Sequence, residues 1–221
     1  MVSASDATWA HIFRSETNEP IPLMAQRLRH IREAGEVLQR LYHGSFVHCV
    51  TAANHQALAL LSLVTRDFAS FRDEAYFHDR PVQFYKRAQI LIADIWACCE
   101  GQGLGLFLDI DEITMFADYR VPQALVYFGV LEYSPNLLKL LRNPTTRLAP
   151  GSQHEMEIRG SSIWAVEQVC QRIRTKWATV PGMSPITVNP VLIDFYLWDL
   201  AKDHQEEMAH IPIHLTRSPF Y

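Results

Sequence analysis

The apolar positions of this chain repeat mainly at the spacing of a helix. From Met24 to Tyr42, apolar residues return every three or four positions, which predicts an amphipathic helix that ends at His43-Gly44. A second helix is predicted from about Phe46 to Phe68, and its run ALALLSLV predicts that it lies in the core. No run alternates convincingly between apolar and polar residues, so the pattern favours helices throughout the chain.

The stretch from Phe84 to Tyr133 is the most informative one. Its first part, to about Cys99, is apolar nearly all round when it is placed as a helix, which is typical of a buried helix. Lys86 lies on this helix, and an unpaired buried ammonium is costly, so Lys86 must be paired, neutralised or directed into a cleft. The alternative without a functional role is that the aliphatic stem of Lys86 lies along the protein surface and that Asp94 is its salt-bridge partner.

The remaining segments also contain helix signals. Residues 71–82 read as a loop, and a short helix opens at Asp109 or Asp111 and runs through Phe116. Further helices are predicted from Pro122, from a capping box at 152–155 to about Trp177, and from Asn189-Pro190 onward. The sequence therefore predicts an all-α, single globular helical domain over residues 1–221, with seven to nine helices and no internal repeat.

Composition and charge restrict the function classes. A chain of 221 residues that is 48% apolar can bury a substantial core within one domain. The net charge of −4 provides no basic patch suited to a nucleic-acid polymer. The longest apolar runs are too short to span a bilayer, and the start MVSASDATW does not resemble a signal peptide. We therefore expect a cytoplasmic protein with no membrane partner.

The metal-binding residue types form no strong motif. The four cysteines make neither a CxxC pair nor a spaced framework, which predicts reduced thiols. Ten histidines are scattered, and only His204, His210 and His214 form a suggestive group. Surface and capping roles explain that group better than a metal does. We expect no metal and no cofactor.

Several long motifs, in the same order, resemble one known family. The phrases FYKRAQILIAD, DIDEITMFADYRVPQ, FGVLEYS, GSQHEMEIRGSSIWAVE and DFYLWDLAKDH are similar to those of the queuosine salvage protein family, the queuosine 5′-phosphate N-glycosylase/hydrolases. The resemblance extends from about Phe13 to Tyr221. It implies an all-helical fold related to helix-hairpin-helix DNA glycosylases, and release of queuine from the nucleoside 5′-monophosphate. The resemblance also implies a further N-terminal portion in family members, with an aromatic-rich segment that helps to wall the base pocket, and we expect this sequence to lack that portion.

The implied reaction places clear demands on a site. Cleavage of an N-glycosidic bond builds positive charge on C1′ and the ring oxygen, and a carboxylate can stabilise that cation, attack it or activate water. Queuine is a 7-deazapurine, so it lacks the N7 that most purine glycosidases protonate. Activation of the leaving base must come from its other edges, which raises the demand on the carboxylate.

The resemblance to helix-hairpin-helix glycosylases also suggests the catalytic pair. In those enzymes a lysine on the hairpin acts with a later aspartate that lies just before a helix, and Lys86 and Asp118 fit that order. We expect Asp118 to be the nucleophile or electrostatic stabiliser, with Lys86 orienting it or binding the phosphate. Asp109 is a rival for the same role, or else it binds the guanine-like edge of the base. Helix capping is the structural alternative for both aspartates.

Further residues are candidates for substrate binding. The 5′-phosphate requires cations or backbone N–H donors, and aromatic rings can stack on the base. Each candidate could equally be a solvated helix charge or a core aromatic. The cationic candidates are Arg87, Arg120 and Arg159, and the aromatic ones are Tyr119, Trp164, Tyr196 and Trp198.

The sequence thus predicts an N-glycosidase that hydrolyses queuosine 5′-monophosphate and returns queuine to tRNA modification. Its partner is a small-molecule nucleotide, and the sequence does not specify an oligomeric state. The alternative is a truncated, catalytically weak helical binding or scaffold protein of the same fold. A glycosylase acting on damaged DNA is disfavoured by the acidic composition.

Overall fold

The computed structural model describes residues 4–17, 19–181 and 186–221, and these residues are mostly helical. They contain nine α-helices, three short 3₁₀ turns and two strands. In order these are α1 (Asp6–Ile12), α2 (Met24–Leu41), α3 (Phe46–Ala52), α4 (Ala57–Asp67), η1 (Ala69–Phe71), β1 (Glu74–Phe77), β2 (Arg80–Gln83), α5 (Lys86–Cys98), η2 (Gly103–Gly105), η3 (Ile110–Glu112), α6 (Arg120–Tyr127), α7 (Pro135–Leu141), α8 (Gln153–Ala178) and α9 (Pro190–Asp203).

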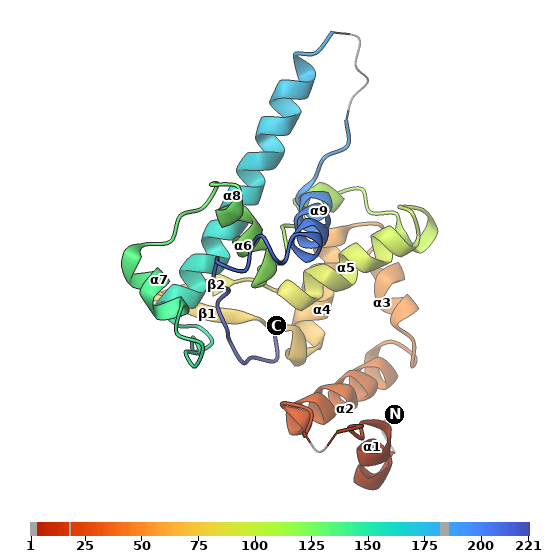
Figure 1. Cartoon of the computed structure of the whole chain (residues 1–221). Coiled ribbons are helices and arrows are strands. Elements are labelled where there is room, and N and C mark those ends of the chain that lie inside the picture. Colours follow the sequence, from red (N-terminus) through yellow and green to blue (C-terminus); the bar gives the residue numbers. More distant parts are fainter. Residues whose placement is uncertain (1–3, 18, 182–185) are drawn as a thin grey trace.

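The core has two main parts. Buried residues of α3, α4 and α5 form the first, around Leu60, Val64 and Ile92. Buried residues of α6, α8 and α9 form the second, around Val121, Val166 and Leu197. In Figure 1, α1 and α2 lie at one end of the molecule and the far end of α8 lies at the other. No helix in the described part of the chain is long and apolar enough to cross a membrane.

The extended segment 113–118 connects the two parts of the core. Ile113, Met115 and Phe116 are buried along it. Gln89 of α5 fixes the segment, because its side-chain oxygen accepts from the backbone N–H of Thr114 at 2.8 Å and its amide group donates to the carbonyl of Phe84. The prediction of a helix through Phe116 was wrong, since only the turn η3 forms.

The predictions for α2 and α9 are confirmed. α2 runs from Met24 to Leu41, and the side chain of Asn189 caps α9 by accepting from the N–H of Leu192. The single helix predicted for 46–68 was wrong. It is broken into α3 and α4 at Asn54 and His55, both of which have positive φ.

The loop predicted for 71–82 is in fact a β-hairpin. β1 and β2 pair antiparallel, with Glu74 opposite Gln83 and Phe77 opposite Arg80. His78 and Asp79 form the two-residue turn and both have positive φ, as a primed hairpin turn requires. Each strand has only four residues, which is too short for the period of two to be evident in the sequence.

The capping box predicted at the start of α8 forms only in part. Ser152 is the N-cap residue, but its side chain makes no capping hydrogen bond. Glu155 accepts instead from the N–H of Gly151 and turns its other oxygen toward the interior. The helix itself ends at Ala178, close to the predicted end.

Candidate active site

Lys86 is the first residue of α5. The residue before it, Tyr85, has a φ of 47°, a conformation that L side chains rarely adopt. The carboxylate of Asp73 accepts from the backbone N–H of Lys86, and the hydroxyl of Tyr85 donates to Glu74. These contacts hold the start of α5. Burial lowers the pKa of Lys86, while the negative charge of Asp118 opposes that shift.

Asp118 lies where segment 113–118 turns into α6, and it is only 7% exposed. Its Oδ1 accepts from the backbone N–H groups of Arg120 and Val121, each at 2.9 Å. Asp118 therefore caps α6, which is the role that the sequence analysis gave as the structural alternative to catalysis. Burial raises the pKa of Asp118, although the N–H of Val121 and the charge of Lys86 act in the opposite direction.

Asp194 is a third member of this group, which sequence reasoning missed. It lies on α9, is 4% exposed, and accepts from the N–H of Phe116 at 2.8 Å. Burial, followed by repulsion from the charge of Asp118, raises its pKa to about 8. A signal was present in the sequence, because Asp194 shares a helical face with the buried Val191 and Leu197.

These three side chains come from three separate elements and are coupled by their charges. Among the described residues, Oδ2 of Asp118, Oδ1 of Asp194 and Nζ of Lys86 make no hydrogen bond with another protein group. Each therefore retains capacity for a bound molecule. Two buried carboxylates beside one ammonium favour a state that holds one proton at neutral pH.

Arg159 does not have the free guanidinium that phosphate binding would need. It is 3% exposed, and it donates to Asp73, to Glu155 and to the carbonyl of Ala117. The ring of Phe84 lies beneath it, 4.0 Å from the guanidinium carbon. Because Asp73 also holds Lys86 and Ala117 precedes Asp118, Arg159 connects the two segments that carry the candidate catalytic residues.

Tyr221 and His214 cover one side of this group. Sequence reasoning missed Tyr221, and the surface or capping role that it expected for His214 was wrong, because His214 is buried. The hydroxyl of Tyr221 donates to Glu155 at 2.6 Å and lies 3.0 Å from Nε2 of His214. Its ring centre lies 5.9 Å from Nζ of Lys86. Burial, together with the charge of Arg159, lowers the pKa of His214 to about 4, so His214 is neutral at physiological pH.

Asp109 is not brought to this group. Its two oxygens accept from the backbone N–H groups of Ala57 and Leu58, so it caps α4 from a distant part of the chain. This cap accounts for the break before α4. Both oxygens of Asp109 are engaged, in contrast with those of Asp118.

The two remaining cationic candidates differ in position. Arg120 lies beside Asp118, donates to Gln123 and stacks over the half-exposed ring of Tyr119 at 5.6 Å. Arg87 follows Lys86 on α5, and it donates to the carbonyls of Ser70 and Pro219. Both arginines lie close to the buried group.

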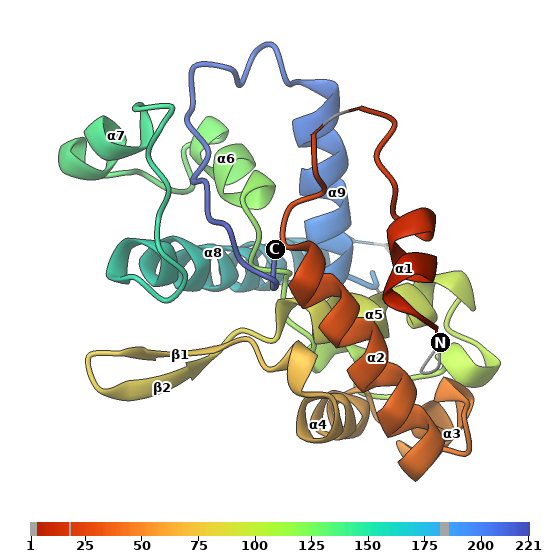
Figure 2. The ribbon, with the colours of Figure 1, turned by 90° about the horizontal axis from the view of Figure 1, so that it is seen from below.

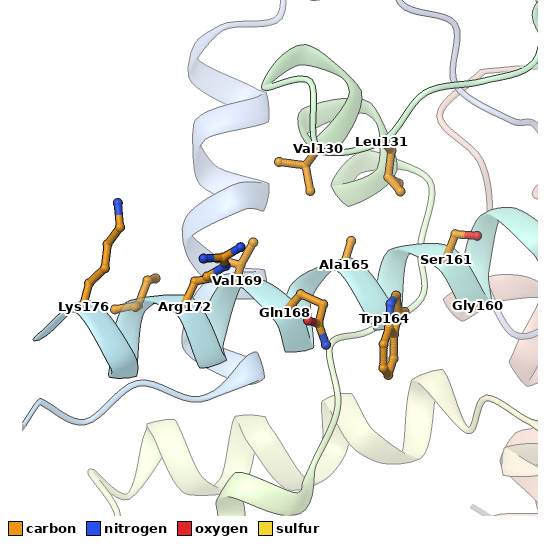
Figure 3. Close-up of a pocket in the computed structure, with 11 residues that line it drawn as sticks. Val130, Leu131, Gly160, Ser161, Trp164, Ala165, Gln168, Val169, Arg172 and Lys176 are labelled. Carbon is orange, nitrogen blue, oxygen red and sulfur yellow. The ribbon is translucent and has the colours of Figure 1, made fainter. Parts of the chain in front are cut away.

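A wide cavity lies away from the group of Lys86, Asp118 and Asp194. It measures about 950 Å³ between α8 and the segment after α6, and Val130 and Leu131 face α8 across it (Figure 3). Trp164 lines it and is 68% exposed. Trp164 follows Arg159 by five residues, which places it roughly 140° around α8. It therefore does not lie on the face that carries Arg159.

The two aromatic candidates of α9 have different orientations. Tyr196 follows Asp194 by two residues, is 62% exposed and lies on the opposite face of the helix. Trp198 follows Asp194 by one turn and lies close to the same face, with Nζ of Lys202 4.4 Å from its ring centre. Of the two, Trp198 is the better placed to contact a ligand near Asp194.

The three C-terminal histidines do not converge. His204 and His210 both contact Glu207, whereas His214 is buried against Tyr221. Within the described ranges, no group of three or more His, Cys, Asp or Glu residues could hold a metal ion.

Comparison with known proteins points to one family. The sequence model described as queuosine salvage protein matches residues 1–221. A queuosine 5′-phosphate N-glycosylase/hydrolase of Nematostella vectensis is 49% identical over 219 residues, which covers 96% of this chain and 62% of that protein. The protein of the same name from Mus musculus is 47% identical over 95% of this chain and 62% of its own length, and the one from Sphaerobacter thermophilus is 38% identical over 96% and 62%. This chain thus spans about three fifths of the length of these curated relatives.

Proposed function

Because this chain belongs to the queuosine salvage protein family, we propose that it carries the residues that hydrolyse the N-glycosidic bond of queuosine 5′-monophosphate. The reaction returns queuine for use in tRNA. The observation that carries this proposal is the buried group of Lys86, Asp118 and Asp194, because each of these side chains has an unused polar atom. Carboxylates in this state are suited to glycosidic-bond cleavage.

The two aspartates take different roles in the proposed mechanism. Asp118 in its ionised form faces C1′ and stabilises the developing cation, or attacks it directly. Asp194 holds a proton near neutral pH, and it donates this proton to the departing base, which has no N7. Water then adds to C1′, and its proton restores the acid. Lys86 favours ionisation of Asp118 and orients it.

The surroundings of the group complete the proposed site. We assign Arg120, Tyr119 and Trp198 to contacts with the substrate, since they lie beside Asp118 or on the face of Asp194. Arg159 is assigned to positioning, and Asp109 to the structure of α4. Trp164 and Tyr196 lie on other faces of their helices and have no role in this proposal.

We further propose that residues 1–221 act as a single domain related to helix-hairpin-helix glycosylases, and that this domain acts on a free nucleotide rather than on a nucleic-acid polymer. The net charge of −4 supports the second point. A cytoplasmic site of action is supported by the four cysteines, which are all free.

The test is release of queuine from queuosine 5′-monophosphate, followed by mass spectrometry. We expect Asp118→Asn to lower the rate by about 10²–10³, the usual effect of removing one charge-stabilising group. Asp109→Asn is the matched control, because it changes a capping carboxylate outside the group, and we expect it to retain the rate. Equal loss in both variants would contradict the assignment of Asp118.

A folded wild-type chain that releases no queuine would support the alternative, a binding or scaffold protein of the same fold. Two explanations of such a result are a chain too short for the chemistry and a wrong substrate, and titration of queuosine 5′-monophosphate against the chain distinguishes them. Binding without release indicates that the chemistry needs more of the family's length than this chain contains, whereas absence of both contradicts the proposed substrate.

A further inference from the structure

A second cavity is lined in part by Tyr221, whose ring centre lies 5.9 Å from Nζ of Lys86. It measures about 260 Å³ between α2, the start of α5 and the segment Ser218–Tyr221. Figure 2 shows the C-terminal end of the chain beside the beginning of α2. The polar side chains that line this cavity are Gln26, Arg27, His30, Arg87, Ser218 and Tyr221.

The charges around this cavity are unbalanced. Arg27 and Arg87 donate to backbone carbonyls, and neither forms an ion pair with a carboxylate of any described residue. Burial and the charge of Arg27 lower the pKa of Arg87, and burial and the charge of Arg87 lower that of His30. Glu33 is the carboxylate that acts against both shifts, but it is engaged with the N–H of Ser70 and does not line the cavity.

The donors of the cavity are also only partly used. One terminal nitrogen of Arg87 donates to the carbonyls of Ser70 and Pro219, and Nε of Arg27 donates to the carbonyl of Pro22. The other terminal nitrogens make no hydrogen bond within the described residues. Two neighbouring arginines with free terminal N–H donors are an arrangement suited to binding phosphate oxygens.

We propose that this cavity binds a phosphate group between Arg27 and Arg87, with His30 on its wall. The anion offsets the repulsion between the two guanidinium groups and accepts their free N–H donors. Inorganic phosphate and the 5′-phosphate of a nucleotide share this chemistry. Only the second source rests on the proposed function, and it is favoured by position, because Tyr221 lines the cavity and also contacts Lys86.

The test is calorimetric titration of inorganic phosphate into the full 221-residue chain. We expect binding that weakens about tenfold or more in Arg27→Gln and in Arg87→Gln, since each substitution removes charge-assisted hydrogen bonds. Arg172→Gln on α8 is the matched control and should bind as the wild type does. Arg27→Gln keeps the test valid if loss of Arg87 unfolds the chain, because Arg27 contacts only the carbonyl of Pro22. Absence of phosphate binding by the wild type, or equal loss in the control, overturns the proposal.

A second arm identifies the source of the phosphate. For queuosine 5′-monophosphate we expect KM to rise about tenfold in Arg27→Gln, with KM for the nucleoside queuosine unchanged. Such a split supports the nucleotide as the source. Phosphate binding that is lost in the variants while both KM values stay constant supports a site for free phosphate and overturns the nucleotide assignment. The titration needs no turnover, so a failure of the proposed function remains separate from a failure of the anion site.

Discussion

Because the pKa of Asp194 is raised, we predict that Asp194→Asn stabilises the protein at neutral pH. The folded state holds a proton on Asp194 up to a pH of about 8, whereas the unfolded chain releases it near 3.8. Between these values the folded state binds more protons, so the free energy of unfolding falls as the pH rises. Asparagine does not titrate, and its carbonyl oxygen can still accept from the N–H of Phe116.

The magnitude follows from the distance between the two pKa values. From 3.8 to pH 7 is about three pH units, and each unit corresponds to about 1.36 kcal/mol, so the wild type loses about 4 kcal/mol through this residue. Asp194→Asn should therefore match the wild type near pH 4 and exceed its free energy of unfolding by about 4 kcal/mol at pH 7. The gain should level off above pH 8, where both states of the wild type have released the proton.

The assay is urea unfolding at several pH values between 4 and 8, with the free energy extrapolated to water. Asp199→Asn, an exposed change on the same helix, is the control, and the difference between its free energy of unfolding and that of the wild type should be the same at each pH. Two further variants test the coupling by its sign. Asp118→Asn removes a charge that raises the pKa of Asp194, so the fall in the free energy of unfolding should end at a lower pH. Lys86→Met removes a charge that lowers this pKa, so the fall should extend to a higher pH. Parallel curves for Asp194→Asn and the wild type would refute the reasoning.

Three other substitutions test the packing around the site by thermal or urea unfolding. Arg159→Met should cost about 3–5 kcal/mol, because it leaves two buried carboxylates without their cation; a cost below 1 kcal/mol would contradict the buried network. Gly105→Ala should cost about 1–3 kcal/mol, because a Cβ there would lie 2.5 Å from the Cβ of Cys99, whereas Gly160→Ala, which meets nothing, should be neutral or stabilising. Asp109→Ala should cost about 1–2 kcal/mol through the lost cap of α4, and an unchanged free energy of unfolding would contradict that role.

The sequence predicted best those features that are local in the chain. α2 was placed correctly through its amphipathic pattern and the stop at His43-Gly44, and α9 through its N-cap Asn189 followed by Pro190. Lys86 stood out because it is a charge on an otherwise apolar helix, and Asp118 stood out through the family motif. The hairpin was missed because four-residue strands leave too few positions for an alternating pattern.

Features that depend on distant partners could not be predicted. Asp109 accepts from Ala57, 52 positions earlier, and this contact decides where α4 begins. Arg159 pairs with Asp73, 86 positions away, so its role as a positioning residue rather than a phosphate ligand is invisible in the sequence. The helical face of Asp194 gave a local signal of burial, but its contact with Phe116 and its coupling to Asp118 depend on residues more than 70 positions away.

The network around Arg159 and the group of Lys86, Asp118 and Asp194 differ in how fully their polar atoms are hydrogen-bonded. This difference distinguishes a structural network from a candidate reaction site. Arg159 meets Asp73, Glu155 and a carbonyl, and its charge is matched by hydrogen bonds on every side that the described residues offer. Such a network holds segments together. Asp118 and Asp194 are buried and Lys86 is partly buried, yet Oδ2 of Asp118, Oδ1 of Asp194 and Nζ of Lys86 make no hydrogen bond with a described residue. A fold does not gain stability from leaving such groups without hydrogen-bond partners, so this contrast supports the proposal that a ligand supplies the partners at this site.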